Sequence, residues 1–298
     1  MEESKIKALI NLLDDPDNIV FNMVEKELLK ENDDIIPELE KKWESSFEES
    51  NQARIENIIQ QLQFKETIKR VKLWLNRSEE ERSLLNIFCH IDRLQYPDLN
   101  PLQIQTKIEK LHKTIWLEFK SSLTLLERIT ILNHFLFNIN GFAINLNNPY
   151  SPQNCFINQI IETRKGNPFS MSIFYTIIAR HLELPAQLVD FPKNPLVAIV
   201  DSNLARKAHG EALQSDVLFY INPSNKGAIT SRKEIEYHLK RGKYLPLHEY
   251  SEPKPDALFI KRLLESIRKA YLEVGYPEKE EKVMSLINLF EKNEELPL

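Results

Sequence analysis

The middle of the chain holds most of the side chains that could carry out chemistry. Two apolar helical patterns meet at a Gly-Asn-Pro turn, residues 166–168, and Ser170 follows in the first turn of the second helix. A serine or cysteine at a helix N-terminus is a typical nucleophile position, because the helix dipole favours the anionic side chain. Cys155, just before the first helix, offers an alternative thiol. Either nucleophile would need a base within hydrogen-bond reach.

The histidines do not supply an obvious base. His181 lies near the far end of the second helix, about 16 Å along its axis from Ser170 at about 1.5 Å per residue. His209 falls in a polar insert, residues 202–216. This insert either folds back and brings His209 over the site, or forms a loop in which His209 is solvated. The other histidines show neither HxH nor HExxH spacing: His90, His112, His134, His238 and His248. The sequence therefore predicts no metal site and no cofactor.

A helix, a tight turn and a second helix must position these residues. Asn167 is a favourable N-cap, because its side chain can accept a hydrogen bond from a free amide of the first turn. Pro168 suits the first helical position, where no amide donor is needed. We therefore expect a core helix over residues 168–182, followed by a turn into a strand.

Short strands are predicted only after the core helix. β-Branched and aromatic runs bounded by Pro, Asn, Asp and Ser indicate strands at residues 187–190, 196–200 and 217–221, with 228–230 as a fourth. These should form a small antiparallel sheet packed on the core helix. A capping box that begins at Ser231 predicts a further helix. The expected fold class is α+β and predominantly helical.

Amphipathic helical patterns fill the flanking regions. The first five pair as helical hairpins, which resemble a degenerate HEAT-type repeat, although a plain helical bundle is the alternative. After a Pro-rich linker, two helices around a turn look like a lone tetratricopeptide-type unit. We expect domains at residues 1–76, 77–244 and 245–298. The expected N-terminal and central helices cover residues 6–13, 19–29, 35–43, 53–62, 67–75, 79–90, 101–119 and 124–139.

The composition argues against a nucleic-acid-binding, secreted or membrane-associated protein. The chain has 298 residues, 42% of them hydrophobic, and a net charge of -5 from 39 basic and 44 acidic side chains. Because the charges are interleaved and no basic run carries aromatics, a nucleic-acid partner is not expected. The acidic N-terminus leads into an amphipathic helix, so we expect no signal peptide, no membrane association and a cytoplasmic location. The two cysteines, Cys89 and Cys155, are expected to be buried free thiols.

Residues 158–185, NQIIETRKGNPFSMSIFYTIIARHLELP, closely resemble the signature of the bacterial SirB-type transglutaminase-like family, in which Glu-Thr-Arg-x-Gly-x-Pro opens the core helix. Residues 190–192 and 221–227 resemble the family's following strand-and-loop elements. The likeness covers residues 80–242. It implies a transglutaminase-like, papain-like core in a bacterial cytosolic protein, with HEAT-like helices before it and tetratricopeptide-like helices after it.

The resemblance implies three catalytic positions, and each is replaced. In the wider superfamily a cysteine stands two residues after a glycine at the start of the core helix, which places it on Pro168. SirB-type relatives typically carry proline there too. Asn194 takes the place of the histidine in a Pro-Gly-His, and Asn222 takes that of an aspartate in an Asp-Pro. The sequence therefore predicts no catalytic triad, with Ser170, His209 and Cys155 as weak substitutes.

The polar residues of the signature have two interpretations. In the structural one, Arg164 pairs with a carboxylate or helix-end carbonyls, and Asn167 caps the core helix. In the functional one, basic side chains surround the free amides at the helix start and bind an anion such as a carboxylate terminus. The ligand-binding candidates are Arg164, Asn167, Ser170 and Lys193.

The sequence therefore leaves three functional hypotheses. The first is a non-catalytic transglutaminase-like protein that acts as an interaction or scaffold module for a protein or peptide partner. The second is a divergent cysteine or serine hydrolase or amidase. The third is a binder of an anionic peptide terminus or small molecule at the vestigial cleft.

Overall fold

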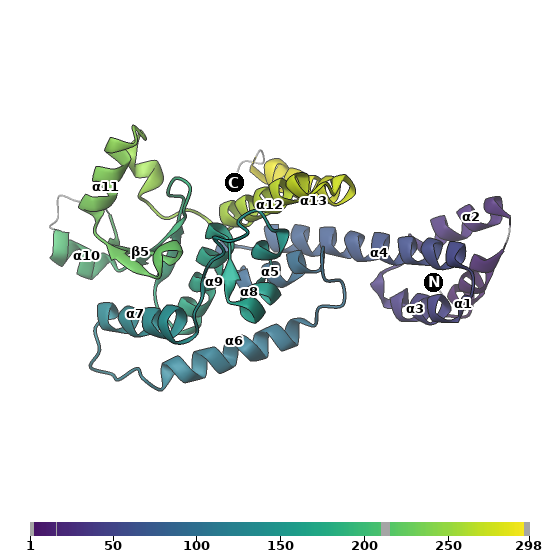
Figure 1. Cartoon of the computed structure of the whole chain (residues 1–298), viewed down its shortest axis with the longest axis horizontal. Coiled ribbons are helices and arrows are strands. Elements are labelled where there is room, and N and C mark those ends of the chain that lie inside the picture. The colour runs from purple at the N-terminus through teal and green to yellow at the C-terminus, as the bar shows by residue number, and fades with distance from the viewer. Residues whose placement is uncertain (1–2, 16, 210–214, 295–298) are drawn as a thin grey trace. The chain divides into compact units, whose positions relative to one another are not determined.

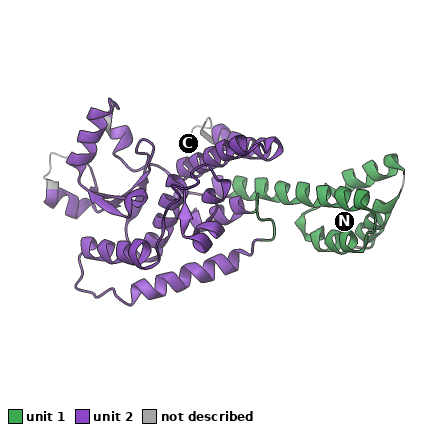
Figure 2. Cartoon of the chain, in the orientation of Figure 1, with its two compact units in different colours: residues 1–73, 93–98 green, residues 74–92, 99–298 purple. Residues whose placement is uncertain are grey.

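The computed structural model describes residues 3–15, 17–209 and 215–294 (Figure 1). The chain forms two compact units, residues 1–73 with 93–98, and residues 74–92 with 99–298 (Figure 2). Helices predominate and small sheets occur in the second unit, which confirms the predicted α+β class. The division into three domains stays a prediction. Among the described helices, none has the length and apolar character needed to cross a membrane.

The first unit is a set of helices around an aliphatic core. One long helix, α4, replaces the two helices predicted at residues 53–62 and 67–75, so that prediction was wrong. Residues 63–66 contain neither Gly nor Pro, and the Thr67 hydroxyl donates to the Gln63 carbonyl at 3.0 Å, which leaves the helix unbroken. The elements are α1 (Glu3–Asn11), η1 (Leu12–Asp14), α2 (Asn18–Leu28), η2 (Asp33–Ile35), α3 (Ile36–Ser45) and α4 (Glu49–Leu75).

The second unit is built around α9 (Pro168–His181), which confirms the predicted core helix to within one residue. Residues 170–179 are all buried, so this helix is covered on every side. A helix with apolar side chains around its whole circumference belongs inside a core. Figure 1 shows it among other helices of this unit and beside the sheet.

Four antiparallel strands pack on α9, in the order β3-β4-β5-β6. This confirms the predicted sheet. The register pairs Ala186 with Ile199 and Val197 with Ile221. The capping box predicted at Ser231 is also confirmed, and it starts α11 (Arg232–Arg241). The strands are β3 (Ala186–Val189), β4 (Leu196–Val200), β5 (Val217–Asn222) and β6 (Ala228–Thr230).

Other elements complete the second unit. Part of the polar insert predicted as a loop is helical, as α10 (Ser202–His209), whose Asp201 carboxylate accepts the Asn203 and Leu204 amides. A two-stranded parallel sheet joins β1 (Ala143–Ile144) to β2 (Lys165–Gly166) ahead of α9, so the prediction that strands occur only after the core helix was wrong. The remaining elements are η3 (Glu79–Glu81), α5 (Leu84–Asp92), α6 (Pro101–Trp116), α7 (Leu125–Asn133), the π-helical η4 (His134–Ile139), η5 (Pro152–Cys155), α8 (Ile157–Thr163), η6 (Pro223–Asn225), η7 (Leu247–Tyr250), α12 (Asp256–Val274) and α13 (Pro277–Glu294).

The loop after β5 is tied to two helices through Gly227. Asn133 donates from Nδ2 to the Gly227 carbonyl at 2.7 Å, and its Oδ1 accepts from the Tyr175 hydroxyl at 2.8 Å. Gly227 has a φ of +73°, and a Cβ there would lie 2.5 Å from Asn133 and 2.7 Å from Phe137. Both the backbone conformation and the close approach therefore require glycine.

We predict that Gly227→Ala destabilises the protein by about 2–4 kcal/mol, since it adds a steric clash to the cost of a positive φ. Gly141→Ala is the matched control, because Gly141 has a φ of +70° and open space around its Cβ position. The control should cost about 1 kcal/mol. Urea unfolding followed by circular dichroism measures both. Equal losses would contradict the clash.

Candidate functional site

The N-terminus of α9 is closed by a reciprocal capping box. Asn167 Oδ1 accepts the Ser170 amide at 2.8 Å, and Ser170 Oγ accepts the Asn167 amide at 3.0 Å. Pro168 occupies the first helical position. The sequence left open whether the free amides at this helix start are capped or bind an anion. The Ser170 amide is capped by the Asn167 side chain.

Ser170 is fully buried, with 0% of its surface exposed. Its hydroxyl donates to the Asn154 carbonyl at 2.6 Å and also lies 3.2 Å from the Asn167 carbonyl. Its oxygen is at the same time an acceptor in the capping box. The hydroxyl proton therefore points to a backbone carbonyl, which cannot act as a general base at neutral pH.

Cys155 lies beside the same cap, at the end of η5. Asn167 donates from Nδ2 to Cys155 Sγ at 3.0 Å. Burial raises the pKa of the Cys155 thiol to about 12, although the hydrogen bond from Asn167 acts in the opposite direction. Because desolvation outweighs this bond, the thiol is held in its neutral form. Burial also raises the pKa of Cys89 to about 12.

The structure brings together Cys155, Asn167 and Ser170, but not a histidine. In the described part of the chain, Cys155 Sγ accepts from the Asn167 side chain, and the partners of Ser170 Oγ are backbone groups of Asn154 and Asn167. The Nδ1 atom of His181 lies 2.9 Å from the Ile177 carbonyl in the last turn of α9. His209 ends α10, and its side chain lies outside what the structure describes.

The other two positions inferred for the triad sit in turns. Lys193 and Asn194 are exposed in the turn before β4, and Lys193 has a φ of +69°. The buried Ser172 hydroxyl donates to the Pro195 carbonyl at 2.9 Å, which anchors this turn to α9. Asn222 ends β5, and its Oδ1 accepts the Asn225 amide at 3.2 Å. Its side chain therefore caps a turn.

A buried carboxylate that sequence reasoning missed caps the neighbouring helix α8. Asp92, at the end of α5, is completely buried and accepts the amides of Ile157 at 3.0 Å and Asn158 at 2.8 Å. Burial raises the pKa of Asp92 well above 3.8, while the two amide donors lower it. A sequence signal existed, because Asp92 follows an apolar run and falls one turn after Phe88 on the buried face of α5.

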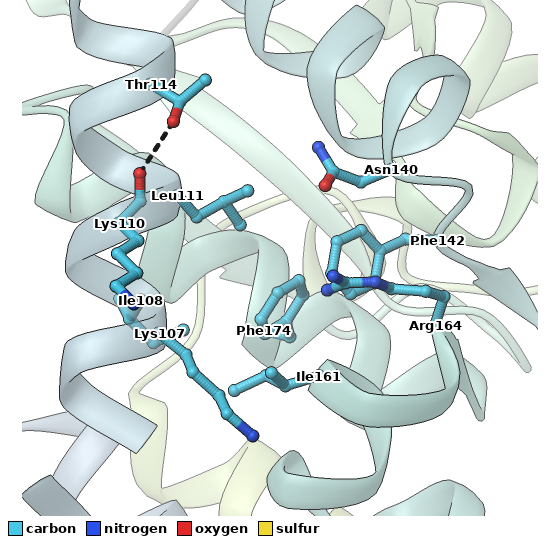
Figure 3. A pocket seen from close by; sticks show the side chains of 10 residues that line it. All are labelled: Lys107, Ile108, Lys110, Leu111, Thr114, Asn140, Phe142, Ile161, Arg164 and Phe174. Atoms are coloured by element: carbon cyan, nitrogen blue, oxygen red, sulfur yellow. Dashed lines mark hydrogen bonds between the residues drawn. The ribbon is translucent and has the colours of Figure 1, made fainter. Parts of the chain in front are cut away.

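Arg164 occupies the left-handed C-cap of α8, with a φ of +62°. Its guanidinium lies over the Phe142 ring, 4.7 Å from the ring centre, rather than against a carboxylate or helix-end carbonyls. It lines a cavity of about 410 Å³ between α6, α8 and α9 (Figure 3). Of the four ligand-binding candidates, only Arg164 is among the residues that line this cavity. They are Lys107, Ile108, Lys110, Leu111, Thr114, Asn140, Phe142, Ile161, Arg164 and Phe174.

Two basic residues of this cavity, Lys107 and Lys110, were not singled out from the sequence. They lie three residues apart on α6, next to the apolar positions Ile108 and Leu111, and a pair of lysines at that spacing is common on solvated helix faces. Among the described residues, no group of three or more His, Cys, Asp or Glu side chains could hold a metal ion.

Comparison with known proteins finds one matching family model and relatives from a bacterium and from mammals. The family model described as "Transglutaminase-like superfamily" matches residues 102–265. A "UPF0162 protein" of Xylella fastidiosa (strain 9a5c) is 26% identical over 202 residues, which cover 65% of this chain and 66% of that protein. Human "F-box only protein 21" is 25% identical over 202 residues, covering 60% of this chain but 31% of that protein. No solved structure matches.

We predict that the stabilising contribution of Asp92 depends on pH. Because the native pKa lies above 3.8, the native state binds this proton more tightly than the unfolded chain. Stability from this group is greatest below pH 3.8 and falls as the pH rises through the native pKa. Asp92→Asn lacks this titration and leaves one amide poorly paired, so it should cost about 1–3 kcal/mol.

Urea unfolding of both proteins between pH 4 and 8 measures this difference. The advantage of the wild type over Asp92→Asn should shrink as the pH rises. Asp98→Asn, at an exposed aspartate, controls for loss of one negative charge. An advantage that grows with pH would show that the native state prefers the ionised carboxylate.

Proposed function

Because the chain belongs to the transglutaminase-like superfamily, we propose that it is a non-catalytic, SirB-type member that acts as an interaction or scaffold module for protein or peptide partners. The start of α9 carries this proposal. Pro168 stands where the resemblance places the nucleophilic cysteine, and the nearest hydroxyl, on Ser170, is buried and engaged in the cap. A nucleophile needs an accessible lone pair and a base, and within the described residues Ser170 has neither.

The remaining catalytic positions support the same proposal. A transglutaminase-like triad needs a histidine oriented by an acid or amide. The corresponding residues are Asn194, exposed in a turn, and Asn222, which caps a turn. An asparagine amide does not titrate near neutral pH, so neither residue can accept a proton during catalysis.

Exposed apolar side chains on the first unit support an interaction role. Ile19 and Met23 lie one turn apart on α2 and are 70% and 67% exposed, and Phe47 is fully exposed. Neighbouring exposed apolar side chains on a helix, such as Ile19 and Met23, are suited to contact another protein. The proposal includes a cytoplasmic setting, HEAT-like and tetratricopeptide-like flanking helices, and no nucleic-acid or membrane partner.

One observation favours the alternative function of a divergent cysteine hydrolase. Cys155 Sγ lies 3.0 Å from Asn167 Nδ2 beside the α9 N-terminus, so a thiol does stand near the place where a nucleophile is expected. Against it, burial raises its pKa to about 12. A conformational opening that exposed the thiol would be required before it could react.

We predict that the native protein releases no ammonia from a glutamine peptide and hydrolyses no peptide bond. Neither a fluorophosphonate nor iodoacetamide should label it, because Ser170, Cys89 and Cys155 are buried. In denaturant, iodoacetamide should label both cysteines. Intact-mass spectrometry reports the labelling, and an ammonia assay reports turnover.

Two variants separate the proposals. If ammonia release is seen and disappears in Cys155→Ala, the cysteine hydrolase is correct. If fluorophosphonate labels the native wild type but not Ser170→Ala, a serine hydrolase is correct. Either result would overturn the non-catalytic function. Circular dichroism of each variant confirms that lost activity does not reflect unfolding.

A further inference from the structure

The cavity between α6, α8 and α9 has the size and lining of a small-molecule site. Its volume of about 410 Å³ lies within the usual range for ligand pockets. Figure 3 shows Lys107, Leu111 and Thr114 on α6 facing Phe142, Phe174 and Arg164 across the cavity. Helix α6 and the elements opposite it belong to the same compact unit.

The cavity is basic. Three of its ten lining residues are cationic, namely Lys107, Lys110 and Arg164, and none of the ten is acidic. Across the described residues, no carboxylate lies within 4.0 Å of any of these three cations. Three cations around one cavity without a counter-ion favour an anionic occupant.

Arg164 presents its donors to this cavity because an aromatic ring holds its side chain. The guanidinium stacks over Phe142, whose ring centre lies 4.8 Å from that of Phe174. Stacking uses the face of the guanidinium and leaves its N–H fork in the plane free to bind a carboxylate. The stacking therefore holds the side chain in place, and within the described residues no hydrogen bond occupies its guanidinium.

The rest of the lining, on both sides of the cavity, is mostly apolar. Ile108, Phe142, Ile161 and Phe174 are buried, and Leu111 is half-buried. Leu111 is the most exposed of them, so a free inorganic anion would leave its side chain in contact with water, whereas an aromatic or aliphatic group attached to the anion would cover it. The lining therefore suits a ligand with a charged end and an apolar end.

We propose that this cavity binds a carboxylate joined to an apolar group, either a small free acid or the C-terminal residue of a peptide. Arg164 pairs with the carboxylate in a bidentate geometry, while Lys107 and Lys110 supply positive charge from α6. The apolar group lies against Phe142, Phe174 and Leu111. This site goes beyond the proposed function and does not depend on whether the core is catalytic.

Isothermal titration calorimetry with 3-phenylpropionate tests the proposal, and 3-phenylpropionamide is the matched uncharged probe. The acid should bind at least about tenfold more tightly than the amide, a ratio typical of a charge-assisted pair. N-acetyl-Ala-Ala-Phe, as free acid and as amide, distinguishes a peptide terminus from a small acid. Tighter binding of phenyl phosphate than of the carboxylate would overturn the carboxylate assignment.

Arg164→Gly is the decisive variant. It removes the guanidinium but places glycine at a φ of +62°, so stability should be kept while affinity falls at least about tenfold. Lys226→Gly is the matched control, because Lys226 has a φ of +48° and lies outside the cavity lining. It removes one charge with the same backbone change and should leave affinity within about twofold.

A second pair of variants tests the location. Thr114→Trp fills the cavity from α6 and should abolish binding. Thr106→Trp is its control on the same helix, since both threonines are exposed and donate to the carbonyl four residues earlier, at 3.0 and 2.8 Å. Undiminished binding to Thr114→Trp, or no binding of either acid up to about 10 mM, would overturn the proposal.

Discussion

The second unit depends on how the N-terminus of its buried helix α9 is closed. A buried helix end must find partners for its free amides, because water cannot reach them. Asn167 and Ser170 supply each other with one hydrogen bond, and the Asn154 carbonyl accepts both the Asn167 amide and the Ser170 hydroxyl. Gly166 makes room for this arrangement, since a Cβ there would lie 2.9 Å from Ser170 Oγ.

Closing the helix and activating a nucleophile compete for the same atoms. The dipole at a helix N-terminus lowers the pKa of an exposed thiol, but taking the thiol out of water has the opposite effect. At Cys155 desolvation is the larger effect, and the pKa rises to about 12. The Ser170 hydroxyl is likewise committed to a carbonyl. Polar groups that satisfy one another inside a core stabilise the fold but are not available to a substrate.

Rules that depend on neighbouring residues in the sequence predicted much of the fold but only part of the candidate site. The Asn167 cap and the core helix follow from neighbouring residues, and the strands follow from short β-branched runs between turn residues. The prediction of two helices in place of α4 was wrong because it assumed a turn at residues 63–66, which contain no helix-breaking residue. The apolar run before Asp92 indicated that this residue is buried, but its partners, Ile157 and Asn158, lie about 65 positions further along the chain. No local pattern can announce such a contact.

The cavity could not be predicted from the sequence either, because its lining comes from segments far apart in the chain. Arg164 was the one lining residue selected in advance. Arg164 could be selected from the signature, yet its environment depends on α6, which lies some fifty residues earlier and contributes both lysines. A left-handed helix cap ordinarily takes glycine or asparagine, and an arginine there costs backbone strain of about 1 kcal/mol or more. At the α9 terminus the polar groups of Asn154, Asn167 and Ser170 are hydrogen-bonded to one another. At the α8 terminus Arg164, a residue with a strained backbone, carries a charge without a carboxylate partner in the described chain, and with Lys107 and Lys110 it leaves positive charge at the cavity uncompensated.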